Sequence, residues 1–126
     1  MLRRLYLVLG ALLAMAGPAV AQQEPAFQGR SLSSLIADLK AQAPMTRNAA
    51  AYSIAGIGPA AAPAVPALIE ALDDESPAVR FPVCVALLEI GPAASAALPA
   101  LEKALDDRNE DVAAMARKAI KTIKQE

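Results

Sequence analysis

The feature that most constrains this chain is an internal repeat. Residues 57–79 recur at residues 90–112, an offset of 33 residues, and 14 of the 23 aligned positions are identical. A fixed period of roughly 20 to 50 residues is typical of solenoid proteins, in which each unit buries its apolar side only against its neighbours. The repeat therefore predicts a fold built by stacking similar units.

The same offset applied backwards indicates a third, divergent copy. Six positions of residues 31–57 match their counterparts 33 residues later: Leu35, Ile36, Leu39, Pro44, Arg47 and Ile57 correspond to Leu68, Ile69, Leu72, Pro77, Arg80 and Ile90. We therefore expect three helix-turn-helix units, over residues 31–57, 58–90 and 91–126, giving an all-α solenoid of about six helices.

Capping and breaking residues predict where the helices begin and end. Ser31 is expected to cap the first helix, and Gly58 followed by Pro59 is expected to stop the second. Ser76 is a plausible cap before Pro77. The expected helices cover residues 31–40, 46–57, 63–72, 77–90, 96–105 and 110–124. Pro82 falls inside one of them, so that helix is predicted either to bend or to start later than its counterparts.

Residues 1–21 have the pattern of a cleavable signal peptide. Arg3 and Arg4 precede an apolar run, and Ala19-Val20-Ala21 is the small-residue pattern before a cleavage site. We expect cleavage after Ala21 and an exported protein, periplasmic or secreted; the alternative is a leader retained as a membrane anchor. Residues 22–30 are expected to form a flexible leader into the domain. No membrane contact is expected beyond residues 1–21.

The charge and composition exclude several classes of function. Loss of Arg3 and Arg4 with the leader would leave 10 basic and 13 acidic residues, a net charge of 10 − 13 = −3. A nucleic-acid partner normally requires a clustered basic surface, so none is expected. The chain has no histidine, which removes the commonest general base and metal ligand. Its single cysteine, Cys84, has no partner for an internal disulfide.

The repeated run from Ile57 to Arg80, with its copy from Ile90, resembles the HEAT repeat in its short bacterial form, also called the HEAT-like or phycobilisome-lyase-type repeat. The resemblance implies a right-handed solenoid that recognises proteins. It also implies a ladder in which an aspartate of each turn pairs with an arginine early in the second helix. The matching positions are Asp74, Asp107, Arg47 and Arg80; Ala113 replaces the third arginine.

Catalytic and metal-binding sites are not expected. The acidic turns at residues 73–75 and 106–111 lack the glycine-punctuated loop of a calcium site, and acidic residues before a helix are favoured electrostatically. Cys84 has only Arg80 and Arg117 as potential activating neighbours, so a passive thiol is favoured. We predict no enzyme, no cofactor and no metal.

The second helices of the three units are expected to line the concave face. Their stacking predicts a partner-binding surface made of Arg47, Tyr52, Arg80, Phe81, Cys84, Leu88, Arg117 and Lys121. Its floor is an apolar row of Phe81, Cys84, Val85 and Leu88 with Tyr52 beside it, and its cationic rim is Arg47, Arg80, Arg117 and Lys121. Such a surface would suit an apolar, acidic peptide or protein surface. The predicted function is a non-enzymatic protein-interaction module. The alternatives are a self-assembling protein, with the row packed inside or closing a homodimer, and an accessory subunit of an enzyme.

Overall fold

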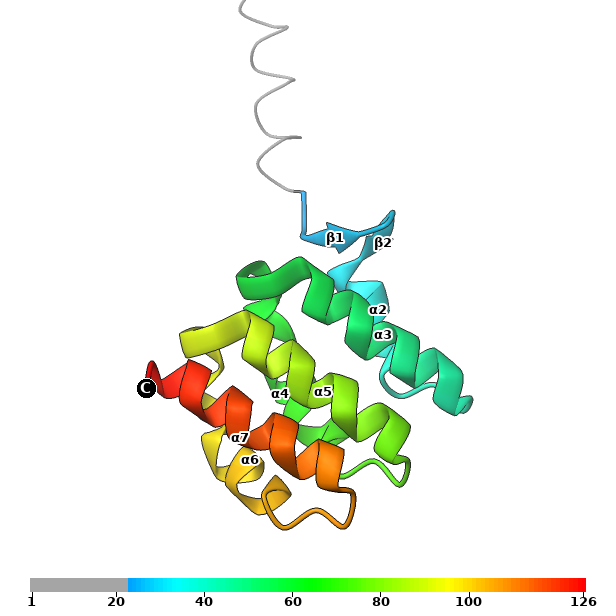
Figure 1. The fold of residues 1–126 in the computed structure, drawn as a ribbon. Helices are drawn as coiled ribbons and strands as arrows, with labels where there is room; N and C mark the ends of the chain where they lie inside the picture. The colour runs from blue at the N-terminus through cyan, green and yellow to red at the C-terminus, as the bar shows by residue number, and fades with distance from the viewer. Residues whose placement is uncertain (1–22) are drawn as a thin grey trace, which may run out of the picture.

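The computed structural model describes residues 23–126, so the predicted signal peptide lies outside the described residues. The described chain is mostly helical (Figure 1). In chain order the elements are the strands β1 (Ala26–Phe27) and β2 (Arg30–Ser31), the helices α2 (Leu32–Asp38) and α3 (Pro44–Ile57), the 3-10 helix η1 (Gly58–Ala64), the helices α4 (Val65–Ala71) and α5 (Pro77–Ile90), the 3-10 helix η2 (Gly91–Ala97), and the helices α6 (Leu98–Ala104) and α7 (Glu110–Lys124).

The helices form two layers. In one layer α3, α5 and α7 lie side by side with α5 in the middle, and α5 contacts both neighbours (Figure 1). The other layer holds α2, α4 and α6, which pack against the first layer from behind. The predicted bounds of α5 and α7 are confirmed. The helices α4 and α6 are shorter than predicted, because a 3-10 helix takes up the first two predicted residues of each and each ends one residue earlier.

The core lies between the two layers. Along α3, α5 and α7 the side chains of the core are almost fully buried, and Ala50, Ile54, Val79, Val83, Leu87, Ile90, Val112, Ala116 and Ile123 are at most 4% exposed. Ile57 and Ile120 are partly buried, whereas Thr46, which the 33-residue offset aligns with the buried Val79 and Val112, is exposed. The physical reason is its place in the stack: no helix precedes α3 in its layer within the described chain.

Glycines with positive φ end α3 and α5. Gly58 has φ 75° and Gly91 has φ 76°, a backbone conformation that a residue with a Cβ rarely adopts.

The stretches Pro44–Ala71 and Pro77–Ala104 are long and apolar enough for membrane spans, with mean hydropathies of 1.4 and 1.7. Each stretch, however, folds back through the 3-10 segment after its glycine, and its apolar residues supply the core.

The predicted flexible leader is wrong for residues 26–30. β1 and β2 pair as a short antiparallel hairpin, in which Phe27 lies opposite Arg30. The hairpin is joined to α2 by a hydrogen bond from the Leu32 N–H to the Pro25 carbonyl (2.8 Å), and the Phe27 ring packs against Gly56 of α3. The ordering comes from these contacts with α2 and α3, which the composition of residues 22–30 does not reveal.

Pro82 lies within α5, and the helix does not start after it. Because proline has no N–H, the carbonyl of Ala78, four residues earlier, loses its helical donor. The Asn48 side chain of α3 supplies a replacement, since its Nδ2 donates to the Ala78 oxygen at 2.6 Å. The predicted later start of this helix is therefore wrong, and α3 satisfies the carbonyl that Pro82 leaves without a donor.

Candidate functional site

Two arginines of the predicted site form the ladder that the resemblance implied. Arg47 makes a two-point pair with Asp74 (Nε to Oδ2 2.7 Å, Nη2 to Oδ1 3.2 Å), and its Nη1 donates to the carbonyls of Ala41 and Gln42. Arg80 pairs in the same way with Asp107 (Nε to Oδ2 2.8 Å, Nη2 to Oδ1 3.0 Å). One pair joins the start of α3 to the turn before α5, and the other joins the start of α5 to the turn before α7, so the predicted ladder is confirmed.

The ladder aspartates also organise the turns in which they lie. The Asp74 carboxylate accepts the Ser76 N–H at 2.9 Å, and Asp107 accepts the Asn109 N–H at the same distance. Ser76 occupies the predicted cap position but makes no capping bond with its own side chain. Ser31, by contrast, accepts the Ser34 N–H as predicted. Each turn aspartate therefore binds both the backbone beside it and an arginine of the preceding helix in the same layer.

The environment of the ladder keeps its carboxylates ionised. The Arg80 guanidinium lowers the pKa of Asp107, against an opposing effect of burial, and the Asn109 N–H lowers it further. Burial raises the pKa of Asp74, but the hydrogen bonds from Arg47 and Ser76 outweigh it and the pKa is lowered overall. The arginine pKa values are raised, each mainly by the hydrogen bond to its aspartate.

The ladder removes Arg47 and Arg80 from the predicted partner surface. Their side chains are only 11% and 16% exposed, and their donors are directed at Asp74, Asp107 and backbone carbonyls. A guanidinium held in this way is not free to bind an acidic partner. The prediction that these two arginines form a cationic rim is therefore wrong.

The prediction that Cys84 is part of the partner surface is also wrong, because Cys84 is fully buried. Burial, with Asp107 nearby, raises the pKa of Cys84 to about 12 against the opposing effect of Arg80. The thiol is therefore protonated and inaccessible, as expected of a passive cysteine. Its equivalent in α3, Ala51, is buried too, whereas Arg117 in α7 is exposed. The difference follows from position: another helix of the same layer follows α3 and α5, but none follows α7 in the described chain.

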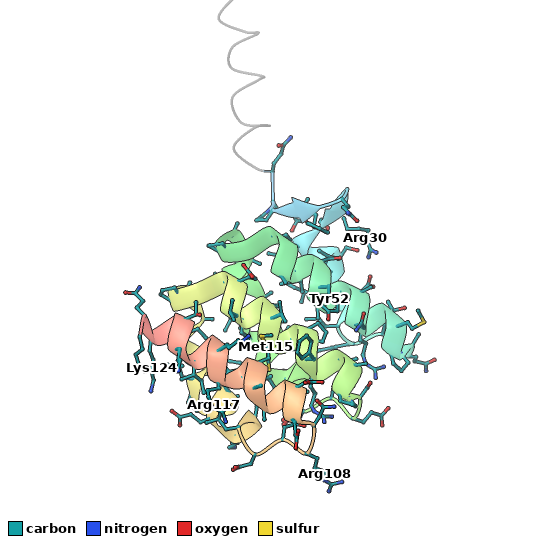
Figure 2. All side chains as sticks on the ribbon, viewed as in Figure 1. Arg30, Tyr52, Arg108, Met115, Arg117 and Lys124 are labelled. Atoms are coloured by element: carbon teal, nitrogen blue, oxygen red, sulfur yellow. The ribbon has the colours of Figure 1, made fainter. Side chains whose placement is uncertain are left out.

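The remaining predicted residues divide between two places. Arg117 lies on the side of α7 away from α5 (Figure 2), so it does not border the apolar row. Lys121 is exposed on the same helix. Phe81 and Leu88 are partly exposed on α5 while packing against the core, and Tyr52 on α3 is 46% exposed. The accessible part of the predicted site therefore centres on Tyr52, Phe81 and Leu88.

Tyr52 and Phe81 meet in a hollow across the layer of α3, α5 and α7. The hollow has a volume of about 420 Å³ and is lined by Asn48, Tyr52, Pro77, Ala78, Phe81, Asn109 and Asp111. We call it the aromatic hollow. The prediction did not include Asn48, Asn109 or Asp111. The repeat offset already placed Asn48 level with Phe81, and this signal could have included it in the site.

The acidic turns show no arrangement of metal ligands. Within residues 23–126 no group of three or more Cys, Asp or Glu side chains lies close enough to hold a metal ion. Two of these carboxylates, Asp74 and Asp107, are engaged by arginines instead. In these turns Asp74 and Asp107 therefore act as members of the structural ladder.

Comparison with protein families matches the chain to the HEAT repeats over residues 32–121. The chain belongs to the HEAT-repeat family. Proteins of this family are generally non-enzymatic scaffolds, and HEAT repeats commonly mediate protein–protein interactions. A search among individually curated proteins found no match.

Proposed function

We propose that this protein is a non-enzymatic recognition module, a right-handed solenoid of three HEAT units that binds a protein or peptide on the face formed by α3, α5 and α7. The observation that carries the proposal is the exposed aromatic surface of this face. Tyr52 is 46% exposed, and together with the partly buried Phe81 it lines a hollow large enough for a side chain. Aromatic side chains that leave water on association are common anchors of protein interfaces.

The back layer offers a weaker candidate surface. The hollow between α2 and α4 is lined by Ser33, Ile36, Lys40, Pro66 and Glu70, among others, and contains no aromatic side chain. Lys40 and Glu70 form a salt bridge of 3.2 Å there, in which both side chains are mostly exposed. The aromatic hollow is therefore the better candidate for recognition.

The leader adds a proposal about location. If residues 1–21 direct export, as their sequence pattern indicates, the partner is met outside the cytoplasm. The alternative to a separate partner is self-assembly, in which the same face closes a homodimer. Both versions use the aromatic hollow, and one experiment separates them.

The test places a photo-crosslinking amino acid at position 81, and at position 103 on α6 as the matched control. We expect a discrete partner to be captured from position 81 and not from position 103, with capture reduced when Tyr52→Ala is added. Capture of a second copy alone, with a sedimentation mass that rises with concentration, would indicate self-assembly. Equal capture from both positions would refute the proposed face.

A further inference from the structure

The aromatic hollow has acceptor groups and one negative charge, but no cationic side chain in its lining. Asp111 is its only charged residue, and within residues 23–126 this carboxylate takes part in no ion pair. Asn48 uses its Nδ2 on the Ala78 carbonyl at 2.6 Å, so its Oδ1 remains an acceptor. The Tyr52 hydroxyl is a third group that can accept a hydrogen bond, beside the Asp111 carboxylate and the Asn48 amide oxygen.

The cations nearest in sequence do not neutralise this charge. Arg80, one residue before Phe81, is directed at Asp107 and at the Asp74 carbonyl. Arg108, in the turn before α7, points away from the molecule (Figure 2). The electrostatic character of the hollow is therefore the opposite of the one predicted for this face from the sequence.

The amide groups at the start of α7 do not make the hollow an anion site. The Asn109 side chain accepts the N–H groups of Asp111 and Val112, at 3.0 and 3.1 Å. Glu110 and Asp111 supply negative charge in the first turn, which the helix dipole favours. At the start of α5, Pro77 has no N–H to offer.

The aromatic walls of the hollow also favour binding of a cation. Tyr52 and Phe81 present aromatic surface, and a cation over an aromatic ring is attracted by its quadrupole. A lysine or arginine side chain also has an apolar stem that can cover such rings while its charged head meets a carboxylate. A volume of about 420 Å³ accommodates one such side chain.

We infer that the aromatic hollow binds a lysine or arginine side chain of the partner, held by Asp111 and Asn48 and covered by Tyr52 and Phe81. This inference rests on the proposed function, because it specifies the chemistry of the partner at the same face. The partner segment is basic at this point, in contrast to the acidic peptide that the sequence predicted.

The test titrates ¹⁵N-labelled protein with three peptides and follows amide chemical shifts. The probes are acetyl-Leu-Arg-Leu-amide, the same peptide with neutral citrulline, and the same peptide with glutamate. We expect shifts at the residues of the hollow, and an affinity for the arginine peptide about two- to five-fold above that for the citrulline peptide. Asp111→Asn should reduce the preference for the arginine peptide over the citrulline peptide, with the remainder coming from the aromatic rings, whereas Glu102→Gln on α6 should leave that preference unchanged.

The inference is overturned by equal affinities for the arginine and citrulline peptides, by tighter binding of the glutamate peptide, or by shifts centred outside the hollow. It also fails if the partner crosslinked from position 81 is captured equally well by Asp111→Asn; the recognition face then stands without the cation pocket. Absence of any partner at position 81 refutes the proposed function, while the peptide titration still decides the chemistry of the hollow.

Discussion

At the scale of single residues, the structure explains how a proline is accommodated inside a helix. Pro82 is fully buried and deprives the Ala78 carbonyl of its helical hydrogen bond. Asn48 donates to that carbonyl from the neighbouring helix. The hydrogen bond joins α3 to α5, and it also orients Asn48 at the edge of the aromatic hollow. A residue that disrupts a helix is thus linked to the geometry of the candidate site.

A double-mutant cycle tests this pairing. Asn48→Ala is expected to lower the free energy of unfolding by about 1 kcal/mol, because the Ala78 carbonyl loses its donor. With Pro82→Ala already present, the N–H restored at position 82 can donate to the same carbonyl, so the cost of Asn48→Ala should nearly vanish. Urea denaturation of the four proteins measures both costs. The same cost in both backgrounds would show that Asn48 does not act through this carbonyl.

At the scale of elements, the hairpin of β1 and β2 covers part of the first end of the stack. Two-residue strands have little stability of their own, and this hairpin depends on its contacts with the helices. Besides the Phe27 contact with α3, Glu24 accepts hydrogen bonds from the Ser33 N–H and hydroxyl, and Arg30 pairs with Asp38. The absence of a side chain at Gly56 makes room for Phe27, since a Cβ there would overlap the ring.

Gly56→Ala tests the packing of the hairpin through the sign of its effect. Within a helix, replacing glycine by alanine ordinarily stabilises by up to about 1 kcal/mol. Here we expect a loss of about 1 kcal/mol, because the new methyl group displaces Phe27. In a Phe27→Ala background the clash is gone, and Gly56→Ala should become stabilising. Thermal unfolding followed by circular dichroism measures both effects, and stabilisation in both backgrounds would contradict the proposed packing.

At the scale of the whole molecule, the ladder links stability to acid pH. The pKa values of Asp74 and Asp107 are lowered in the folded protein, so around the ordinary aspartate pKa of 3.8 the unfolded chain binds more protons than the folded protein. Their contribution is present above the ordinary aspartate pKa of 3.8 and is lost as the pH falls through the lower folded values. The chain has no histidine, so no histidine titration contributes between pH 5 and 8.

Asp107→Asn should remove part of this pH dependence. At pH 7 we expect a loss of about 2 kcal/mol in the free energy of unfolding, because Arg80 is left largely buried without its carboxylate. The difference from the parent protein should persist at pH 5 and shrink as the pH falls below 3.8. Urea titrations across this range measure it, with Asp106→Asn, an exposed neighbour in the same turn, as the control. A difference that stays constant to pH 2.5 would contradict the linkage.

The sequence by itself determined the features that depend on local signals and on the period. The 33-residue offset placed α5 and α7, the glycines Gly58 and Gly91 marked the ends of α3 and α5, and the resemblance to the HEAT repeat identified both pairs of the ladder. These predictions succeed because helix bounds depend on nearby residues. The ladder was predicted from the family resemblance, and its two pairs span the same 27 residues along the chain.

Only the tertiary structure decided which of those residues a partner can reach. Ala51, Cys84 and Arg117 lie at 33-residue intervals on α3, α5 and α7, yet the first two are buried and the third is exposed. Arg47 and Arg80 were assigned to both the ladder and the partner surface, and their ion pairs favour the ladder alone. The hairpin and the aromatic hollow likewise depend on contacts between distant segments. Exposure is set by which elements pack against a residue, and the repeat offset, which aligns residues of inner and outer helices without distinction, does not contain that information.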